Sequence, residues 1–164
     1  MKKTGYTLIE IIIVVGILGI IAVVGSAMFF SILKSSTKTK TLHLVKQNGD
    51  YALSVMVRMI RNARELVSPT EDSVTSSITI KNPDGGTTIF ACDSSLITSN
   101  SASLISSEVK VSDCSNVFEV KVGKRGIKPA EVKINFSLTP AQEGTRPEEK
   151  VTVDFQTGVI LRNY

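Results

Sequence analysis

Glu10, Cys92 and Cys114 are the residues of this 164-residue chain whose types and positions could do chemistry. Glu10 directly precedes the uncharged and mostly apolar stretch Ile11–Phe30. A carboxylate that enters a bilayer unpaired costs a few kcal/mol, so Glu10 is expected to have a cationic partner. The next basic residue along the chain, Lys34, lies too many helical turns away. The partner of Glu10 must therefore come from elsewhere.

The two cysteines, Cys92 and Cys114, both follow the apolar stretch. An even number of cysteines favours a disulfide if this part of the chain lies outside the cytoplasm. Closing a loop of about 20 residues would contribute roughly 3 kcal/mol to stability. The alternative is that the two cysteines are unpaired and buried as small apolar residues.

The composition offers little for catalysis or for metal and cofactor binding. The chain has no Trp and a single His, His43, and it contains no glycine-rich phosphate loop and no nucleophile elbow. The spacing of four acids differs from that of a calcium loop; they are Asp72, Asp84, Asp93 and Asp113. We therefore predict that the protein is not an enzyme, holds no metal and needs no cofactor.

The net charge argues against a nucleic-acid surface. The formal charge is +4, and removal of Met1–Gly5 with its two lysines would lower it to +2. A balance this mild does not predict binding to a polyanion.

The apolar stretch is long enough to span a membrane. At about 1.5 Å rise per residue, a helix over Ile11–Phe30 covers the roughly 30 Å of bilayer hydrocarbon. The alternative is a secretory signal peptide that is cleaved near Gly25–Ala27, but this stretch exceeds the core length of such a peptide and begins with Glu10. Basic residues flank both ends, so their count does not set the orientation; they are Lys2 and Lys3, then Lys34, Lys38 and Lys40.

The segment Gly5-Tyr6-Thr7-Leu8-Ile9-Glu10 resembles the class III signal of type IV prepilins and type II secretion pseudopilins. In that family a short basic leader ends in Gly, and an aromatic residue and Thr-Leu-Ile-Glu follow. Tyr6 departs from the usual Phe but keeps a large aromatic ring. The motif covers about a sixth of the chain. What we expect of the remaining residues therefore depends on their own sequence patterns.

The resemblance implies a processing and assembly route. A membrane prepilin peptidase would remove the leader, residues 1–5, after Gly5 and N-methylate Tyr6. The chain would be single-pass in the cell membrane, in contact with lipid, with its C-terminal domain outside the cytoplasm. An inner-membrane assembly platform would then add it to other pilin or pseudopilin subunits in a filament at the cell surface or in the periplasm.

Cleavage would supply the missing cation for Glu10. The new amine of Tyr6 lies four residues before Glu10, at the spacing of one helical turn. The amine could pair with Glu10 of its own chain or of a neighbour in a filament, and the sequence does not choose between these. Breaking such a buried pair typically costs about 3 to 5 kcal/mol.

The rest of the chain divides into a second helical segment and a β-rich domain. Apolar residues recur every three or four positions from Leu42 to Val67, which predicts an amphipathic helix over 34–67 that continues the membrane helix over 6–33. Beyond Pro69, over 68–164, short β-branched runs separated by turn residues predict antiparallel strands. The runs are 77–81, 87–92, 109–111, 117–122, 131–138, 151–155 and 159–162. Gln156–Gly158 is expected to be a turn, and the serine-rich stretch 94–107 an exposed loop.

These elements predict an α+β fold, in which the amphipathic part of the helix packs on an antiparallel sheet. This plan resembles the pilin fold, with the long helix as its stem. The segments Arg58–Arg64 and Val159–Tyr164 also resemble minor pilins and the J-type minor pseudopilin of type II secretion. The leading prediction is a structural subunit, of the minor type, of a type IV pilus or a secretion or DNA-uptake pseudopilus. The alternative is a monomeric membrane-anchored adhesin or binding module.

Overall fold

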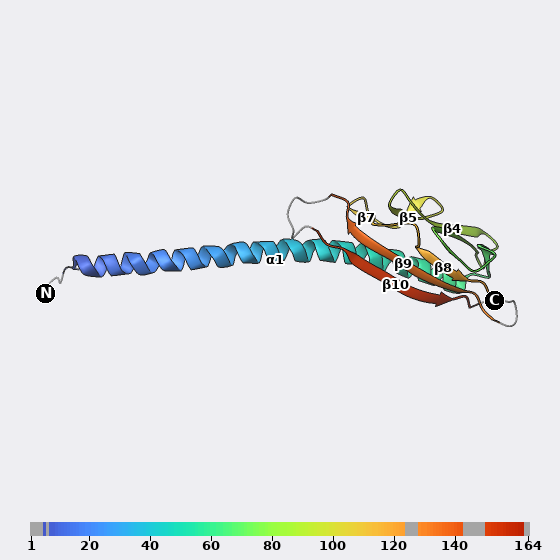
Figure 1. Ribbon diagram of the computed structural model, residues 1–164, viewed down its shortest axis with the longest axis horizontal. Helices are drawn as coiled ribbons and strands as arrows, with labels where there is room; N and C mark the ends of the chain where they lie inside the picture. Colours follow the sequence, from blue (N-terminus) through green and yellow to red (C-terminus); the bar gives the residue numbers. More distant parts are fainter. Residues whose placement is uncertain (1–4, 6, 124–127, 143–149, 163–164) are drawn as a thin grey trace.

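A single long helix dominates the molecule and carries a β-rich head at its far end (Figure 1). The computed structural model describes residues 5, 7–123, 128–142 and 150–162. Helix α1 spans Leu8–Asn62, 55 residues, which corresponds to about 80 Å. The head is built from strands β1 to β10, and the α+β pilin-like fold predicted from the sequence is confirmed.

The first half of α1 stands free of the head. Every residue from Leu8 to Lys40 is exposed, including the large apolar side chains of the stretch that precedes Lys34. By length and composition, α1 is the one helix among the described residues that could cross a membrane. Soluble monomers rarely expose so large an apolar surface, and surfaces of this size mark sites of interaction with proteins or membranes.

The second half of α1 packs on the head through one stripe of residues. The buried positions recur every three or four residues, as an amphipathic helix requires; they are Val45, Gly49, Ala52, Met56 and Ile60. The predicted stripe is confirmed over this range. At its start, Leu42 remains 42% exposed, because the head begins to cover the helix only near Val45.

The helix ends five residues earlier than predicted. It stops at Asn62, and Ala63 has an extended backbone with φ −61° and ψ 146°. Glu65–Ser68 forms strand β1, which pairs antiparallel with strand β3, Ser77–Lys81. The prediction of a helix over 34–67 was therefore wrong for residues 63–67. Because Val67 lies on this strand rather than on the helical stripe, it is 41% exposed.

The first sheet has five antiparallel strands in the order β1-β3-β4-β5-β6. Strand β3 is Ser77–Lys81 and β4 is Thr87–Asp93, close to the predicted runs. Strands β5, Leu96–Ser99, and β6, Ala102–Ser103, lie inside the serine-rich stretch that was predicted to be an exposed loop. That prediction was wrong because Ile97 and Ile105 are buried in the core.

The second sheet packs against α1. Its order is β10-β9-β8-β2, and β7 also pairs with β9. Its strands are β2 Ser73–Thr75, β7 Val109–Val111, β8 Phe118–Lys121, β9 Glu131–Pro140 and β10 Val153–Ile160. Figure 1 shows β9 and β10 lying along the second half of α1. All pairings are antiparallel, as predicted.

Strand β10 corrects the expected turn at Gln156–Gly158. Those residues lie in the middle of one continuous strand that pairs with β9 from Val153↔Leu138 to Ile160↔Glu131. Gly158 interrupts the β-branched pattern, which suggested a chain reversal. The pairing of β10 with β9 nevertheless continues through this residue. Two predicted runs are thus one strand, because the partner strand β9 is long enough to pair with both.

Candidate processing and assembly site

The predicted cleavage position lies just before α1. Gly5 is exposed, and a Cβ atom added to it would meet no other atom within 4 Å. Tyr6, the predicted new N-terminus and methylation position, lies outside the described residues. The fold of the described chain therefore places no steric demand on Gly5, and any requirement for glycine there must come from a partner.

Thr7 and Glu10 together begin the helix. Thr7 is the N-cap, with φ −81° and ψ 152°. The Glu10 carboxylate lies 3.4 Å from the backbone amide of Thr7 and 3.5 Å from its hydroxyl. This arrangement belongs to a capping box, in which the third helical residue reaches back to the N-cap amide. The Thr-x-x-Glu spacing is the signal in the sequence that could have predicted this cap.

The site is electrostatically suited to a carboxylate and to an added amine. Glu10 lies in the first turn of α1, where the positive end of the helix dipole stabilises negative charge. Within one chain the carboxylate remains exposed, and only long hydrogen bonds to Thr7 occupy it. It is therefore accessible to the amine that cleavage after Gly5 would create.

Three glycines of the apolar stretch have no role in the fold of the described chain. A Cβ at Gly16, Gly19 or Gly25 would meet nothing within 4 Å. Glycine in a helix interior is less favourable than alanine by roughly 0.5 to 1 kcal/mol. Small residues permit close approach of a neighbouring membrane helix, and glycine is also more frequent in membrane helices generally.

Cys92 and Cys114 are joined by a disulfide in the structure, with their Cα atoms 5.3 Å apart. Cys92 lies on β4 in the first sheet, and Cys114 follows β7 of the second. The bond therefore ties the two sheets together. Next to it, the backbone amide of Ser115 donates to Asp113 at 2.9 Å. This hydrogen bond, with a smaller contribution from the Ser115 hydroxyl, lowers the pKa of the Asp113 carboxyl.

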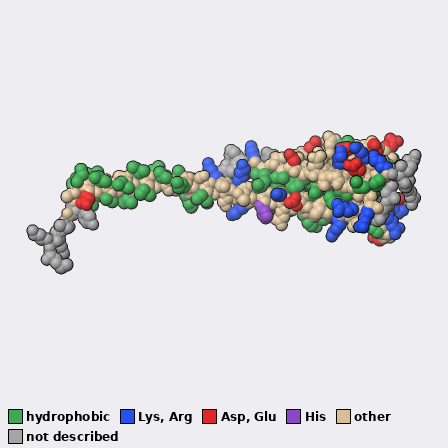
Figure 2. Space-filling model, turned by 90° about the horizontal axis from the view of Figure 1, so that it is seen from below, with side chains coloured by type: hydrophobic (Ala, Val, Ile, Leu, Met, Phe, Trp, Pro, Cys, Tyr) green, Lys and Arg blue, Asp and Glu red, His purple; other side chains and the backbone are tan. Residues whose placement is uncertain are grey.

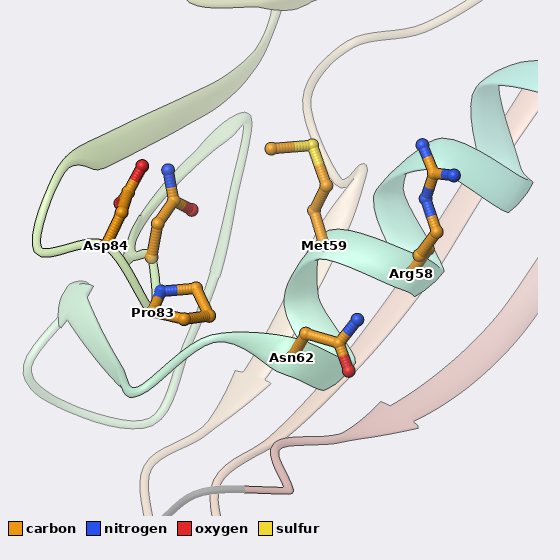
Figure 3. A pocket seen from close by; sticks show the side chains of 6 residues that line it. Arg58, Met59, Asn62, Pro83 and Asp84 are labelled. Atoms are coloured by element: carbon orange, nitrogen blue, oxygen red, sulfur yellow. The ribbon is translucent and has the colours of Figure 1, made fainter.

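Two hollows on the described part of the head are lined by residues that form no catalytic set. One, of about 350 Å³, lies between the last turns of α1 and the β3–β4 turn. In Figure 3, Met59 reaches from the helix toward that turn. The residues that line this hollow are Arg58, Met59, Asn62, Asn82, Pro83 and Asp84, which include no nucleophile.

The second hollow, of about 320 Å³, lies on the second sheet. Lys133 pairs there with Glu119 at 3.2 Å. Its lining is completed by Val74, Asn116, Asn135 and Gln156. Among the described residues, no group of three or more His, Cys, Asp or Glu side chains is placed to hold a metal ion.

Comparison with known proteins bears on the N-terminus alone. Residues 1–26 match the family model of the prokaryotic N-terminal methylation motif. No curated protein and no solved structure gives a significant match to the chain. The matched range contains Gly5, Tyr6 and Glu10 and ends inside the apolar half of α1. The chain therefore carries the methylation motif of type IV prepilin-type precursors, joined to a head with a pilin-like α+β fold.

Proposed function

We propose that this protein is a structural subunit, of the minor type, of a type IV pilus or a type II secretion pseudopilus. The observation that carries the proposal is the methylation motif over residues 1–26, placed directly at the start of a helix whose first half is bare. A motif of this kind marks a precursor that is processed at the membrane and then assembled with other pilin-type subunits.

Assembly through α1 would bury the surface that the monomer exposes. In the precursor, the bilayer covers the apolar side chains between Ile11 and Leu33, and in a filament neighbouring helices replace the lipid. The exposed Glu10 carboxylate would then meet the Tyr6 amine of its own or an adjacent subunit. Pairing removes the penalty of placing either charge in apolar surroundings.

We further propose that the head lies outside the cytoplasm. The leader, which carries Lys2 and Lys3, would face the cytoplasmic peptidase site, and the apolar helix would place residues 34–164 on the other side. The disulfide between Cys92 and Cys114 supports this placement, because disulfides persist in oxidising compartments.

The minor-subunit assignment rests on the sequence alone. Arg58–Arg64 and Val159–Tyr164 resemble the patterns of minor pilins and of the J-type minor pseudopilin. Shearing separates this proposal from a monomeric membrane-anchored adhesin or binding module. A filament subunit should appear in sheared filaments, at a low ratio to the major subunit, whereas a monomeric module should stay in the membrane fraction.

Processing is tested by expressing the full chain with and without a prepilin peptidase and determining the N-terminus and intact mass. We expect a mature chain that begins at Tyr6 and carries one added methyl group, formed only when the peptidase is present. Gly5→Ala is the informative variant, since the added Cβ meets no atom in the fold. Loss of cleavage in this variant reports recognition by the peptidase. A mature chain that begins elsewhere, or that loses the whole apolar stretch, contradicts the proposal.

A further inference from the structure

Between the apolar stretch and the head, α1 has a bare segment that we call the neck, residues 34–44. Its residues are exposed or half-buried, and the first buried residue of the helix is Val45. From Leu33 to Val45 the helix advances by about 18 Å. Figure 2 shows Lys and Arg side chains at the junction where the narrow apolar stem meets the head. The neck is therefore accessible to molecules that lie next to α1 at the membrane surface.

We propose that Lys34, Lys38 and Lys40 of the neck form a binding site for the phosphate headgroups of anionic phospholipids. This inference rests on the membrane insertion proposed above. It assigns a ligand to a surface that the proposed cleavage after Gly5 and the proposed pairing at Glu10 do not use.

The depth of the three lysines fits lipid phosphates. The helix from Ile11 to Leu33 is about 34 Å long, close to the roughly 30 Å thickness of the hydrocarbon. Lys34 thus emerges at the boundary, and Lys38 and Lys40 lie about 6 and 9 Å further along the axis. The headgroup layer on each side is about 5 to 7 Å thick. Lysine stems extend along apolar surface and direct the ammonium group to polar surroundings, so all three can reach this layer.

The local charges favour an anionic ligand. No Asp or Glu occurs between Glu10 and Asp50 in the sequence. Within the part of the chain that the structure describes, the three lysines are exposed and form no ion pair. The Thr37 and Thr39 hydroxyls donate to the carbonyls of Leu33 and Ser35 at 3.1 and 2.9 Å. These short side chains bond to the helix backbone, so the lysines are the charged groups that this segment presents.

Orientation signals do not account for these lysines. Positive residues normally gather on the cytoplasmic side of a membrane helix. The neck lysines would lie on the opposite side, and cleavage after Gly5 would remove Lys2 and Lys3 from the cytoplasmic side. The mature chain would then keep its membrane-flanking basic side chains on one side only, where they are explained by contact with anionic lipid.

The absence of Trp from the sequence provides a clean test. Leu33→Trp places one fluorophore at the end of the apolar stretch, next to the neck. The full chain is reconstituted in phosphatidylcholine bilayers that contain phosphatidylglycerol, and one of the two lipids is brominated at a time. The ratio of quenching by the two brominated lipids measures which lipid is enriched around residue 33.

We expect phosphatidylglycerol to be preferred several-fold at low salt. A lysine near an anionic surface contributes a factor of about five, which corresponds to about 1 kcal/mol. The preference should fall to near unity in Lys34→Gln/Lys38→Gln/Lys40→Gln and in high salt, and should persist in the corresponding triple Arg variant. The matched control, Lys46→Gln/Lys121→Gln/Lys150→Gln, removes three exposed charges elsewhere and should retain the preference.

Three outcomes would overturn the inference. Equal quenching by both lipids in Leu33→Trp with all three lysines intact shows that no anionic site exists. An unchanged preference in the triple Gln variant shows that these lysines do not form it. If the preference is absent but the triple Gln variant fails to enter filaments, the lysines contact another subunit instead. Absence of quenching by either lipid contradicts the membrane insertion itself, so failure of the proposed function is distinguishable from failure of this site.

Discussion

Asn48 on the helix accepts a 2.8 Å hydrogen bond at its Oδ1 atom from the backbone amide of Ser106, 58 residues further along the chain. Its Nδ2 atom donates to the carbonyl of Leu44 at 2.9 Å. One half-buried side chain therefore holds the segment between β6 and β7 against the first part of α1 that packs on the head.

Asn48→Ala removes both hydrogen bonds and leaves the Ser106 amide without this partner. We expect a loss of about 1 to 2 kcal/mol in the free energy of unfolding. Hydrogen exchange should accelerate at Ser106 and its neighbours, since this segment loses its tie to the helix. The neighbouring exposed Gln47→Ala is the control, and it should change stability by less than about 0.5 kcal/mol. Unchanged exchange at Ser106 in Asn48→Ala would show that the tie is unimportant.

Gly49 is required by its contact with Phe155. A Cβ at Gly49 would overlap the Phe155 ring, which itself stacks on Phe136 with ring centroids 5.3 Å apart. In an open helix interior Gly→Ala would stabilise by roughly 0.5 to 1 kcal/mol, but overpacking here should cost about 1 to 3 kcal/mol. Chemical denaturation of Gly49→Ala shows whether the free energy of unfolding rises or falls. In a double-mutant cycle, Phe155→Leu should relieve much of the loss, and additive effects would refute the steric explanation.

The β5–β6 turn offers a stabilising substitution. Asn100 and Ser101 both have positive φ, 48° and 69°, as in the type I′ turns that favour Asn-Gly. Asn100 also accepts a hydrogen bond from the Ile89 amide at 2.8 Å. Ser101→Gly should raise stability by about 0.5 kcal/mol, because relief of the left-handed backbone exceeds the added chain entropy. The control Ser99→Gly, in strand β5, should instead lower stability. The midpoints of thermal unfolding of the two variants measure the difference.

The Cys92–Cys114 disulfide should be a major contributor to head stability. The sequence separation is 22 residues, for which loop closure predicts about 3 kcal/mol. Reduction with dithiothreitol should lower the midpoint of denaturant unfolding. Cys92→Ser/Cys114→Ser should show a similar loss in the absence of reductant and no further response to it. A wild-type midpoint that is the same with and without reductant would mean that the bond is absent or carries no stability.

Glu10 caps α1, and we propose that it has a second, separable role in pairing with the new amine. Glu10→Gln keeps a side chain that can reach back to Thr7, because Gln also serves in a capping box, but removes the negative charge. If pairing drives assembly, both Glu10→Gln and Glu10→Ala should strongly reduce incorporation into sheared filaments, with the head fold unchanged by circular dichroism. If only the cap matters, Gln should assemble like the wild type, which would contradict the role proposed for the charge.

Local patterns in the sequence were sufficient for the N-terminal half. The class III signal and the apolar stretch are contiguous, so Gly5, Glu10 and the helix behind them could be predicted without tertiary information. The buried stripe from Val45 to Ile60 followed from helical periodicity. The α+β class followed from the change of period beyond Pro69.

Contacts between distant residues decided the rest. Residues 63–68 leave the helix because β3 offers a pairing edge, and β10 passes straight through Gln156–Gly158 because β9 continues beside it. The serine-rich stretch forms β5 and β6 because Ile97 and Ile105 reach the core that other strands build. Ser and Gly have weak local preferences, so long-range pairing and burial determine their conformation. For the same reason only the folded chain shows that Gly49 must accommodate a ring 106 residues later in the sequence.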